Sequence, residues 1–429
     1  MFARSHTRLT QARQVSAALA VLWSGSALAQ ENDWLRFGMT ASPAPTQSYD
    51  REFIKEWERN PPKGYPTLSA ANIAPMKAAI ARYEAIVKAG GWQPIPEVRP
   101  LEGHALQMAQ THPYVALIRA RLLATGDLED GGSAGKPYFD QALEKAVKRF
   151  QASNGLTPTG IVDERTAAAM SVPADARLKQ LKVNLGRVAE LAGSRPRKYV
   201  IVNIPAAQVE AVESGQVVSR HTGVVGKTER PTPLLKSSIT NLNFNPMWTL
   251  PPTVIDKDLI PKGRDMAAHN QNVLVKFGID AYDASGRKLD PTKINWASSQ
   301  PHGLSYKQQP GKENPLGFLK INFDSANSVY MHDTPSELLF GKNVRAASSG
   351  CVRVHNIEIL AAWLLGPQGW SEEQVRGMRA SGERKDVSLK QPVALNFVYV
   401  TAWATPDGVV QFRRDLYQRD GVGPVAAGY

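Results

Sequence analysis

The sequence lacks the features that mark several large classes of protein. Cys351 is the only cysteine among 429 residues, so the chain cannot form an internal disulfide. It contains no H-E-x-x-H motif, no cysteine cluster and no carboxylate-rich loop, so we expect neither a metal ion nor another cofactor. No apolar run reaches the roughly 20 residues that a membrane-spanning helix needs.

Long runs of one charge are also missing. The formal net charge is +12 and the sequence pI is about 9.6, yet Lys and Arg are scattered along the chain. A basic surface of this kind favours general attraction to an anionic matrix such as wall polymers, and we expect no nucleic-acid partner. With 42% hydrophobic and 21% charged residues, the composition is that of a globular protein with two or three domains.

The N-terminus has the pattern of an export signal. Three arginines come before a short apolar stretch at residues 15–22, and Ala27-Leu28-Ala29 supplies small residues at the usual cleavage position. We therefore predict a signal peptide over residues 1–29 and a mature protein in the periplasm or cell wall. An uncleaved membrane anchor is the alternative interpretation.

Export makes the single thiol informative. A lone cysteine in an oxidising compartment is open to oxidation, so it needs a reason to be present. One interpretation is a buried, inert Cys351, because cysteine is common in protein cores. The other is a reactive nucleophile, and composition alone does not separate the two.

Periodicity divides the rest of the chain into helical and strand-rich parts, which together predict a multi-domain α+β protein. Met76, Ile80, Tyr83 and Val87 are spaced as on one helix face, which predicts a helix over 70–89. The predicted parts are a lead-in with a helical scaffold (30–111), a small three-helix domain (112–175), a helical linker (176–196), a mainly-β domain (197–405) containing an insertion or lid (256–310), and a C-terminal tail (406–429).

Within the three-helix part, the sequence predicts where helices begin and end. Gly155 fits a helix C-terminus, where a positive φ carries no Cβ penalty, and Asp163 fits the N-cap of the helix that carries Thr166.

The mainly-β part has short β-branched runs punctuated by Gly and Pro. Residues 208–212 and 216–225 flank Ser214-Gly215, which predicts a hairpin. Many short strands of this kind favour a β-sandwich or barrel-like fold over a doubly wound sheet. Further strands are predicted at 199–204, 238–243, 273–277, 317–322, 328–331 and 394–401.

One pair of segments combines residues that can do nucleophilic chemistry. Cys351 lies in a Ser-Ser-Gly-Cys turn, and small residues there let a substrate backbone approach closely. His332 ends an apolar strand nineteen positions upstream, and an imidazole that accepts the thiol proton would raise the thiolate fraction. From spacing alone, any of the seven other histidines could be the base.

Two families resemble this chain on specific motifs. Residues 112–175 resemble the three-helix peptidoglycan-binding domain. The residues that match are Ala146, Phe150, Gln151, Gly155, Leu156, Gly160, Asp163 and Thr166. The segments around residues 332 and 351 resemble the YkuD-type L,D-transpeptidase catalytic domain, whose signature is a His followed by a Ser/Thr-x-Gly-Cys-hydrophobic-Arg turn. The chain is most similar to the large periplasmic, multi-domain branch of that family.

The resemblance to L,D-transpeptidases implies roles for the matching residues. Cys351 would attack a tetrapeptide donor stem and form a thioester, while His332 would accept and later return protons. The N–H groups of Gly350 and Cys351 would stabilise the oxyanion. Arg353 would hold a stem-peptide carboxylate, with a structural salt bridge as the alternative. Many family members have a His where this chain has Ser349, which leaves His332 as the main base.

The remaining candidates are residues for substrate binding. Ser348 and Ser349 belong to the turn, and Tyr306 and Trp248 are expected near the lid. Aromatic residues in a β-rich domain are more often part of the core, so packing is the alternative role for both rings. Sequence suggests that a carbonyl at Asp333 or a neighbouring residue orients the ring of His332.

The resemblance implies an enzyme of cell-wall biogenesis and leaves its acceptor open. The expected partners are peptidoglycan stem peptides, glycan strands through the helical domain, and carbapenem-type β-lactams as inhibitors. The same acyl-enzyme would serve an L,D-carboxypeptidase or an enzyme that attaches proteins to peptidoglycan. A non-catalytic wall-binding protein with a structural cysteine is the third interpretation.

Overall fold

A computed structural model describes residues 66–98, 103, 105–129, 131, 134–193 and 195–424. The predicted signal peptide and residues 30–65 of the predicted lead-in lie outside these residues. In the described part of the chain, no helix is both long and apolar enough to span a bilayer.

The predicted three-helix part has its own hydrophobic core, formed by residues from Ile95 to Val172. Its elements are β1 (Ala105–Leu106), α3 (Pro113–Thr125), α4 (Gln141–Ser153), β2 (Val162–Asp163) and α5 (Glu164–Ser171). Both predicted helix signals are confirmed. Gly155 follows α4 with φ +71°, and the Asp163 carboxylate accepts the Thr166 N–H at 2.9 Å at the start of α5.

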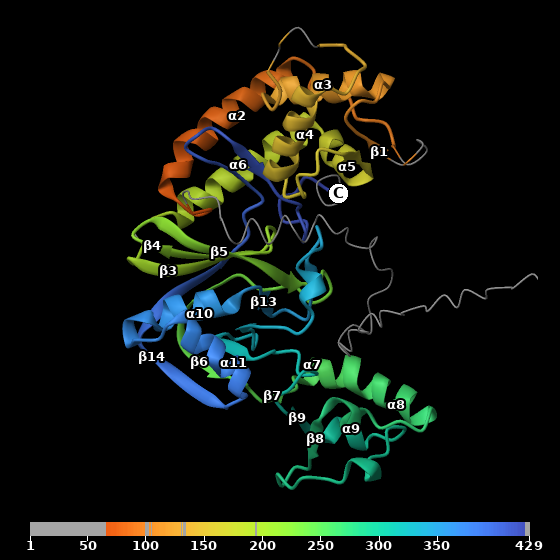
Figure 1. Ribbon diagram of the computed structural model, residues 1–429, viewed down its shortest axis with the longest axis vertical. Helices are drawn as coiled ribbons and strands as arrows, with labels where there is room; N and C mark the ends of the chain where they lie inside the picture. The colour runs from red at the N-terminus through yellow and green to blue at the C-terminus, as the bar shows by residue number, and fades with distance from the viewer. Residues whose placement is uncertain are drawn as a thin grey trace, which may run out of the picture. The chain divides into compact units, whose positions relative to one another are not determined.

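Two longer helices flank this part in the sequence and pack against each other (Figure 1). They are α2 (Ile73–Lys88), which follows the short 3-10 turn η2 (Ala70–Asn72), and α6 (Ala174–Leu191). The helix predicted over 70–89 is therefore confirmed. Met76 and Tyr83 of α2 and Leu181 of α6 are buried in a cluster that continues into the sheet through Ile201 and Val398.

The mainly-β part is a closed, mixed sheet, which confirms the barrel-like expectation. Its strand order is β12-β5-β13-β11-β10-β6-β14-β3-β4, and an additional β4–β5 pairing closes the sheet on itself. The pairs β11–β13, β14–β3 and β12–β5 are parallel. The strands are β3 (Lys198–Asn203), β4 (Gln208–Glu213), β5 (Gln216–Gly226), β6 (Leu235–Phe244), β10 (Leu319–Phe323), β11 (Met331–His332), β12 (Ala346–Ser348), β13 (Val352–Val354) and β14 (Lys385–Val398).

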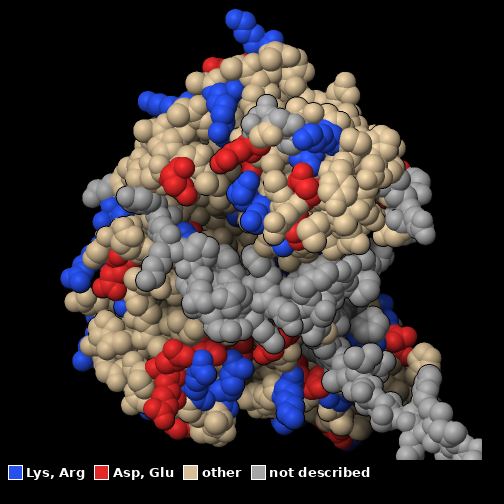
Figure 2. All heavy atoms as spheres, turned by 45° about the horizontal axis from the view of Figure 1, so that its top comes forward, with Lys and Arg blue, Asp and Glu red and all other residues tan. Residues whose placement is uncertain are grey.

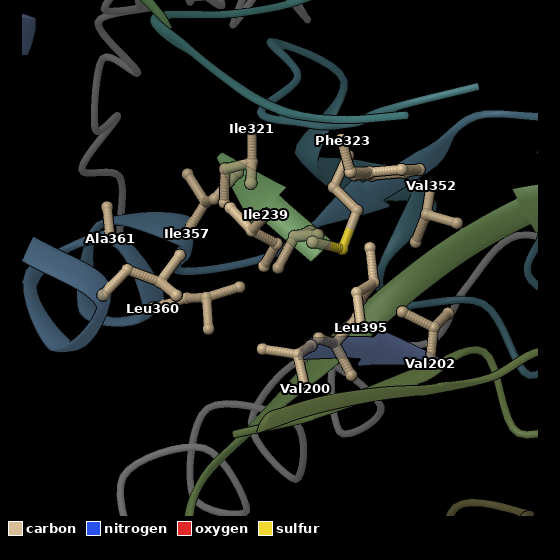
Figure 3. Close-up of a cluster of buried hydrophobic side chains, with 14 of the residues drawn as sticks. Val200, Val202, Ile239, Ile321, Phe323, Val352, Ile357, Leu360, Ala361 and Leu395 are labelled. Atoms are coloured by element: carbon tan, nitrogen blue, oxygen red, sulfur yellow. The ribbon is translucent and has the colours of Figure 1, made fainter. Parts of the chain in front are cut away.

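Apolar side chains fill the space between the strands and two helices, α10 (Ile357–Leu365) and α11 (Glu372–Ser381), which lie side by side in Figure 1. Figure 3 shows Ile357 and Leu360 of α10 facing strand residues such as Ile239, and all three are fully buried. Near-continuous β-branched stretches such as residues 199–202 form these strands because both of their faces are covered.

The insertion has a separate core, with members from Trp248 to Leu316, so it extends beyond the predicted 256–310 on both sides. Its three-stranded sheet consists of β7 (Trp248–Thr249), β8 (Ile279–Tyr282) and β9 (Ser305–Gln308). Its helices are α7 (Pro252–Val254), the π-helix η4 (Ile255–Leu259), α8 (Ile260–Ala268) and α9 (Val273–Phe277), with the 3-10 turns η5 (Pro291–Lys293) and η6 (Gln300–Gly303). Another 3-10 turn, η7 (Glu337–Leu339), lies between β11 and β12, and η8 (Gly366–Gln368) lies between α10 and α11.

The strand predicted at 273–277 is wrong, because these residues form helix α9. The side chain of Asn272 caps the N-terminus by accepting the N–H groups of Leu274 and Val275 at 2.9 and 3.2 Å. Gly278 ends the helix at φ +61°. These two caps outweigh the β-branched composition of the segment.

Residues after β14 continue the packed structure. Strand β15 (Ala402–Ala404) pairs with β16 (Val410–Phe412), and the segment that follows packs Leu416 and Tyr417 against the barrel core. On the face shown in Figure 2, Lys and Arg side chains are interspersed with Asp and Glu side chains. That face shows the scattered charge that the sequence predicts.

Candidate active site

The site is built where β11 and β13 run parallel. Met331 is registered with Val352, and His332 with Arg353. Alternate residues of a strand point to opposite faces, and registered neighbours point to the same face. Met331 and Val352 are buried in the barrel core, so Cys351 and His332 share the opposite face. The segments that carry His332 and Cys351 are therefore adjacent in the sheet.

The turn that carries Cys351 is fastened by its own polar groups. The hydroxyl of Ser348 accepts the Gly350 N–H at 3.1 Å and donates to the Cys351 carbonyl at 2.5 Å. Gly350 has φ +118°, a conformation that other residues rarely adopt. Ser348 is 5% exposed, so the predicted substrate contact is corrected to a structural role in the turn.

The hydrogen bond from Gly350 also changes the expected oxyanion donor. Its N–H already has an acceptor in Ser348, which contradicts its assignment as a donor to substrate in this conformation. The N–H of Cys351 has no hydrogen-bond partner among the residues that the structure describes. Of the two predicted donors, only Cys351 presents a vacant N–H.

His332 is held as a neutral ring. Its Nδ1 lies 2.5 Å from the carbonyl of Asp333, and a carbonyl can only accept, so Nδ1 carries the proton and Nε2 is the basic nitrogen. Burial lowers the pKa of His332 to about 3, and the positive charge of Arg353 acts in the same direction. The carbonyls of Asp333 and Pro315 oppose that shift because they favour the imidazolium.

The half-buried Cys351 is likewise neutral at rest. Burial raises the pKa of its thiol above the usual range, which outweighs the opposing effects of the Tyr330 N–H and hydroxyl and of the charges on Lys320 and Arg353. The Tyr330 hydroxyl favours the thiolate and so lowers the pKa of Cys351, and it accepts the indole N–H of Trp248 at 2.8 Å. The ammonium of Lys320 lies 4.3 Å from the centre of the Tyr330 ring.

A buried ion pair connects the turn with the insertion. Arg230 donates to Ser349 Oγ at 2.8 Å and forms a 2.8 Å salt bridge with Asp258 of the π-helix η4. The side chains of Arg230 and Asp258 are only 11% and 6% exposed. Ser349 itself is exposed, so it remains accessible to substrate.

Two of the predicted cleft aromatics belong to the core of the insertion. Tyr306 is fully buried, donates its hydroxyl to the Pro301 carbonyl at 3.1 Å and stacks on Trp296, so the predicted substrate contact is wrong. Trp248 is 5% exposed and donates its indole N–H to the Tyr330 hydroxyl at 2.8 Å. The packing alternative, which the sequence left open, applies to both. Arg353 is buried beside His332, and its predicted carboxylate contact stays a prediction.

Sequence reasoning missed four side chains that shape the site: Tyr330, Lys320, Thr232 and Arg230. Tyr330 could have been predicted, because it lies two residues before His332 and side chains two apart in a strand lie on the same face. Lys320 is registered with His332 from the antiparallel strand β10, a pairing that sequence does not reveal. In the described part of the chain, no group of three or more His, Cys, Asp or Glu side chains could hold a metal ion.

Comparisons with known proteins agree with this geometry. Residues 197–387 match the family model described as "L,D-transpeptidase catalytic domain", and this stretch contains both His332 and Cys351. This part of the chain is therefore similar to L,D-transpeptidase catalytic domains. Residues 111–170 match a second model, described as "Putative peptidoglycan binding domain".

A relative from Haemophilus influenzae named "Putative L,D-transpeptidase" is 32% identical to this chain over 221 residues. The match covers 52% of this chain and 44% of that protein, so the chain spans less than half the length of the relative. An L,D-transpeptidase structure from Xylanimonas cellulosilytica has 17% identity and a TM-score of 0.23, covering 70% of this chain and 100% of that one. A structure of an L,D-transpeptidase in complex with imipenem has 12% identity and a TM-score of 0.23, covering 47% and 59% respectively.

Proposed function

We propose that the protein is an exported enzyme that cross-links peptidoglycan stem peptides through a thioester on Cys351. The observation that supports this proposal is the parallel register of β11 and β13, in which His332 pairs with Arg353, two residues after Cys351. The match of residues 111–170 to a peptidoglycan-binding model supports the choice of substrate. A cell-wall substrate in turn agrees with the export signal expected from the sequence.

In the first half-reaction, Cys351 Sγ attacks the carbonyl between the L-centre and the terminal D-residue of a tetrapeptide donor. Nε2 of His332 takes the thiol proton, and the carbonyl of Asp333 stabilises the imidazolium through Nδ1. The carbonyl oxygen becomes an oxyanion that accepts the N–H of Cys351. The C–N bond then breaks, and the D-residue leaves with the proton from His332.

In the second half-reaction, an acceptor amine attacks the thioester. His332 removes the amine proton, a new amide bond forms, and the sulfur leaves as a thiolate that regains its proton. Arg353 is the candidate for holding a stem-peptide carboxylate, because its planar guanidinium can bind both carboxylate oxygens. Ser349, exposed beside it on the turn, is the second candidate contact.

Two measurements test the proposal. After incubation with a carbapenem, intact mass should show one adduct on the wild type and none on Cys351→Ala. An unmodified wild type would contradict the assignment of Cys351 as the nucleophile. Muropeptides from cells that overexpress the protein should contain new direct cross-links between two meso-diaminopimelate residues. Tripeptides without new cross-links would instead indicate an L,D-carboxypeptidase. A protein covalently attached to muropeptides would indicate an attachment enzyme.

A further inference from the structure

The C-terminal segment contacts the loop that supports the nucleophile, although it lies beyond residue 387, where the catalytic family match ends. The hydroxyl of Tyr417 donates to the Gly226 carbonyl at 2.5 Å and accepts the N–H of Thr232 at 3.1 Å. Its ring stacks on Tyr399, with centroids 5.7 Å apart. One phenol therefore holds both ends of the 226–232 loop.

The same loop contacts the nucleophile turn at three points: Lys227 donates its N–H to the Ser348 carbonyl at 3.0 Å, Arg230 donates to Ser349, and the buried Thr232 hydroxyl holds the Gly350 carbonyl. Thr232 Oγ1 accepts the Gly226 N–H at 2.8 Å and donates to the Gly350 carbonyl at 2.9 Å. The loop closes tightly on Gly226, because a Cβ added there would lie 2.2 Å from the Arg230 carbonyl oxygen. If Thr232 moved, its hydrogen bond would therefore move the Gly350 carbonyl as well.

The Gly350 carbonyl matters because it shares a peptide group with the Cys351 N–H. A peptide group is planar and trans, so its C=O and N–H point in opposite directions. When Thr232 fixes the direction of the oxygen, it also fixes the direction of the N–H on the other side. That N–H is the vacant donor described above.

We propose that Tyr417 is a positioning residue, which acts through Thr232 to hold the Gly350–Cys351 peptide so that its N–H faces the oxyanion. The inference rests on the proposed function, because an oxyanion forms only if Cys351 attacks a carbonyl. It adds to the catalytic domain a positioning residue that lies thirty residues beyond the end of the family match.

The segment around Tyr417 is held in place by its own hydrogen bonds and by a salt bridge. The backbone N–H of Tyr417 donates to the Tyr399 hydroxyl at 2.6 Å, and that hydroxyl donates to the fully buried Asp415 at 2.7 Å. Asp420 forms a 2.7 Å salt bridge with Arg187 of helix α6. Tyr417 is thus anchored independently of the loop that it supports.

The test separates carbonyl chemistry from simple access to the sulfur. In Tyr417→Phe, the ring stacking is retained and only the hydroxyl is lost. Acylation of Cys351 by a carbapenem passes through an oxyanion and should slow by about tenfold, since small misplacements of catalytic groups have large effects on rate. Alkylation of Cys351 by iodoacetamide forms no oxyanion, so its rate should not change.

Thr401→Val is the matched control. The Thr401 hydroxyl is fully buried, accepts the Asn184 side-chain N–H at 2.7 Å and donates to Asp420 at 2.5 Å, so its loss weakens the anchor of the C-terminal segment without touching the 226–232 loop. It should lower the melting temperature at least as much as Tyr417→Phe while leaving the acylation rate unchanged. If the acylation rate fell equally in Tyr417→Phe and Thr401→Val, the effect of Tyr417→Phe would be a loss of stability only. That result would overturn the inference.

A double-mutant cycle tests the path through Thr232. If both residues act on one peptide group, Thr232→Val together with Tyr417→Phe should slow acylation much less than the product of the single effects. Independent, multiplicative effects would overturn the inference, as would a wild-type rate in Tyr417→Phe. If the wild type itself forms no carbapenem adduct, the proposed function fails and this inference fails with it.

Discussion

The effect of the Tyr330 hydroxyl on the pKa of Cys351 leads to a quantitative prediction. Tyr330→Phe removes the hydroxyl that lies between Trp248 and Cys351 and keeps the aromatic ring beneath the Lys320 ammonium. A thiolate gains more from this donor than a neutral thiol does, because the hydrogen bond is stronger to a charged acceptor. The substitution should therefore raise the pKa of Cys351 further above its already raised value.

The expected size follows from the strength of such a bond. A hydrogen bond to a charged group contributes about 1.5–3 kcal/mol. One pKa unit corresponds to about 1.4 kcal/mol, so the pKa of Cys351 should rise by about 1–2 units. The Lys320 and Arg353 charges remain in the variant and continue to favour the thiolate.

The assay is the pH dependence of iodoacetamide alkylation, followed by intact mass. Alkylation of the wild type should increase with pH through a midpoint above the ordinary thiol pKa, because burial disfavours the thiolate. Tyr330→Phe should move this midpoint upward. Trp248→Phe keeps the Tyr330 hydroxyl and should move it less. An unchanged or lower midpoint in Tyr330→Phe would refute the reasoning.

Three further predictions follow from the site. The pKa of His332 falls from 6.5 in the unfolded chain to about 3 in the folded protein, so its contribution to stability is present above the unfolded pKa and is lost as pH falls. Denaturant unfolding should show a loss of about 2 kcal/mol between about pH 7 and about pH 5 that His332→Gln lacks, and equal losses would contradict the burial argument. Ser348→Ala should lower the free energy of unfolding by about 1–3 kcal/mol and slow acylation. Ser349→Ala, at an exposed position, should change the free energy of unfolding by less than about 0.5 kcal/mol. Similar losses of stability in the two variants would contradict the assigned turn geometry. Asp258→Asn leaves the Arg230 charge buried without its partner and should cost about 3–5 kcal/mol in denaturant unfolding, more than the double substitution Arg230→Met with Asp258→Leu. A less stable double variant would argue against that electrostatic explanation.

Local patterns made much of the fold predictable from the sequence. The hairpin around Ser214-Gly215 formed as β4 and β5, and the helix predicted over 70–89 formed as α2, because in both segments one strong periodicity met a clear stop signal. The segment 273–277 failed for the opposite reason. Its β-branched residues resemble a strand, and its short length left the caps at Asn272 and Gly278 to decide the structure.

The functional site was predictable only where chemistry is confined to a short motif. The Ser-Ser-Gly-Cys turn and His332 drew attention because few residue types can supply a nucleophile and a base. The supporting contacts come from distant segments: Thr232 lies 118 positions from Gly350, and Tyr417 lies 185 positions from Thr232. A hydroxyl that bonds to a backbone carbonyl has no local pattern, so such partners become visible only in three dimensions.

The neutral resting state of the site connects its chemistry with the compartment that we propose. The thiolate is the form that oxidants attack, and an exported chain with one cysteine has no second thiol with which to resolve an oxidised sulfur. Burial keeps Cys351 as a thiol and His332 as an uncharged ring until a carbonyl is in place. The thiolate is then needed only during attack, when the Tyr330 hydroxyl and the neighbouring cations stabilise it. In the mechanism that we propose, reactivity is therefore coupled to substrate binding, and burial protects the lone thiol between turnovers.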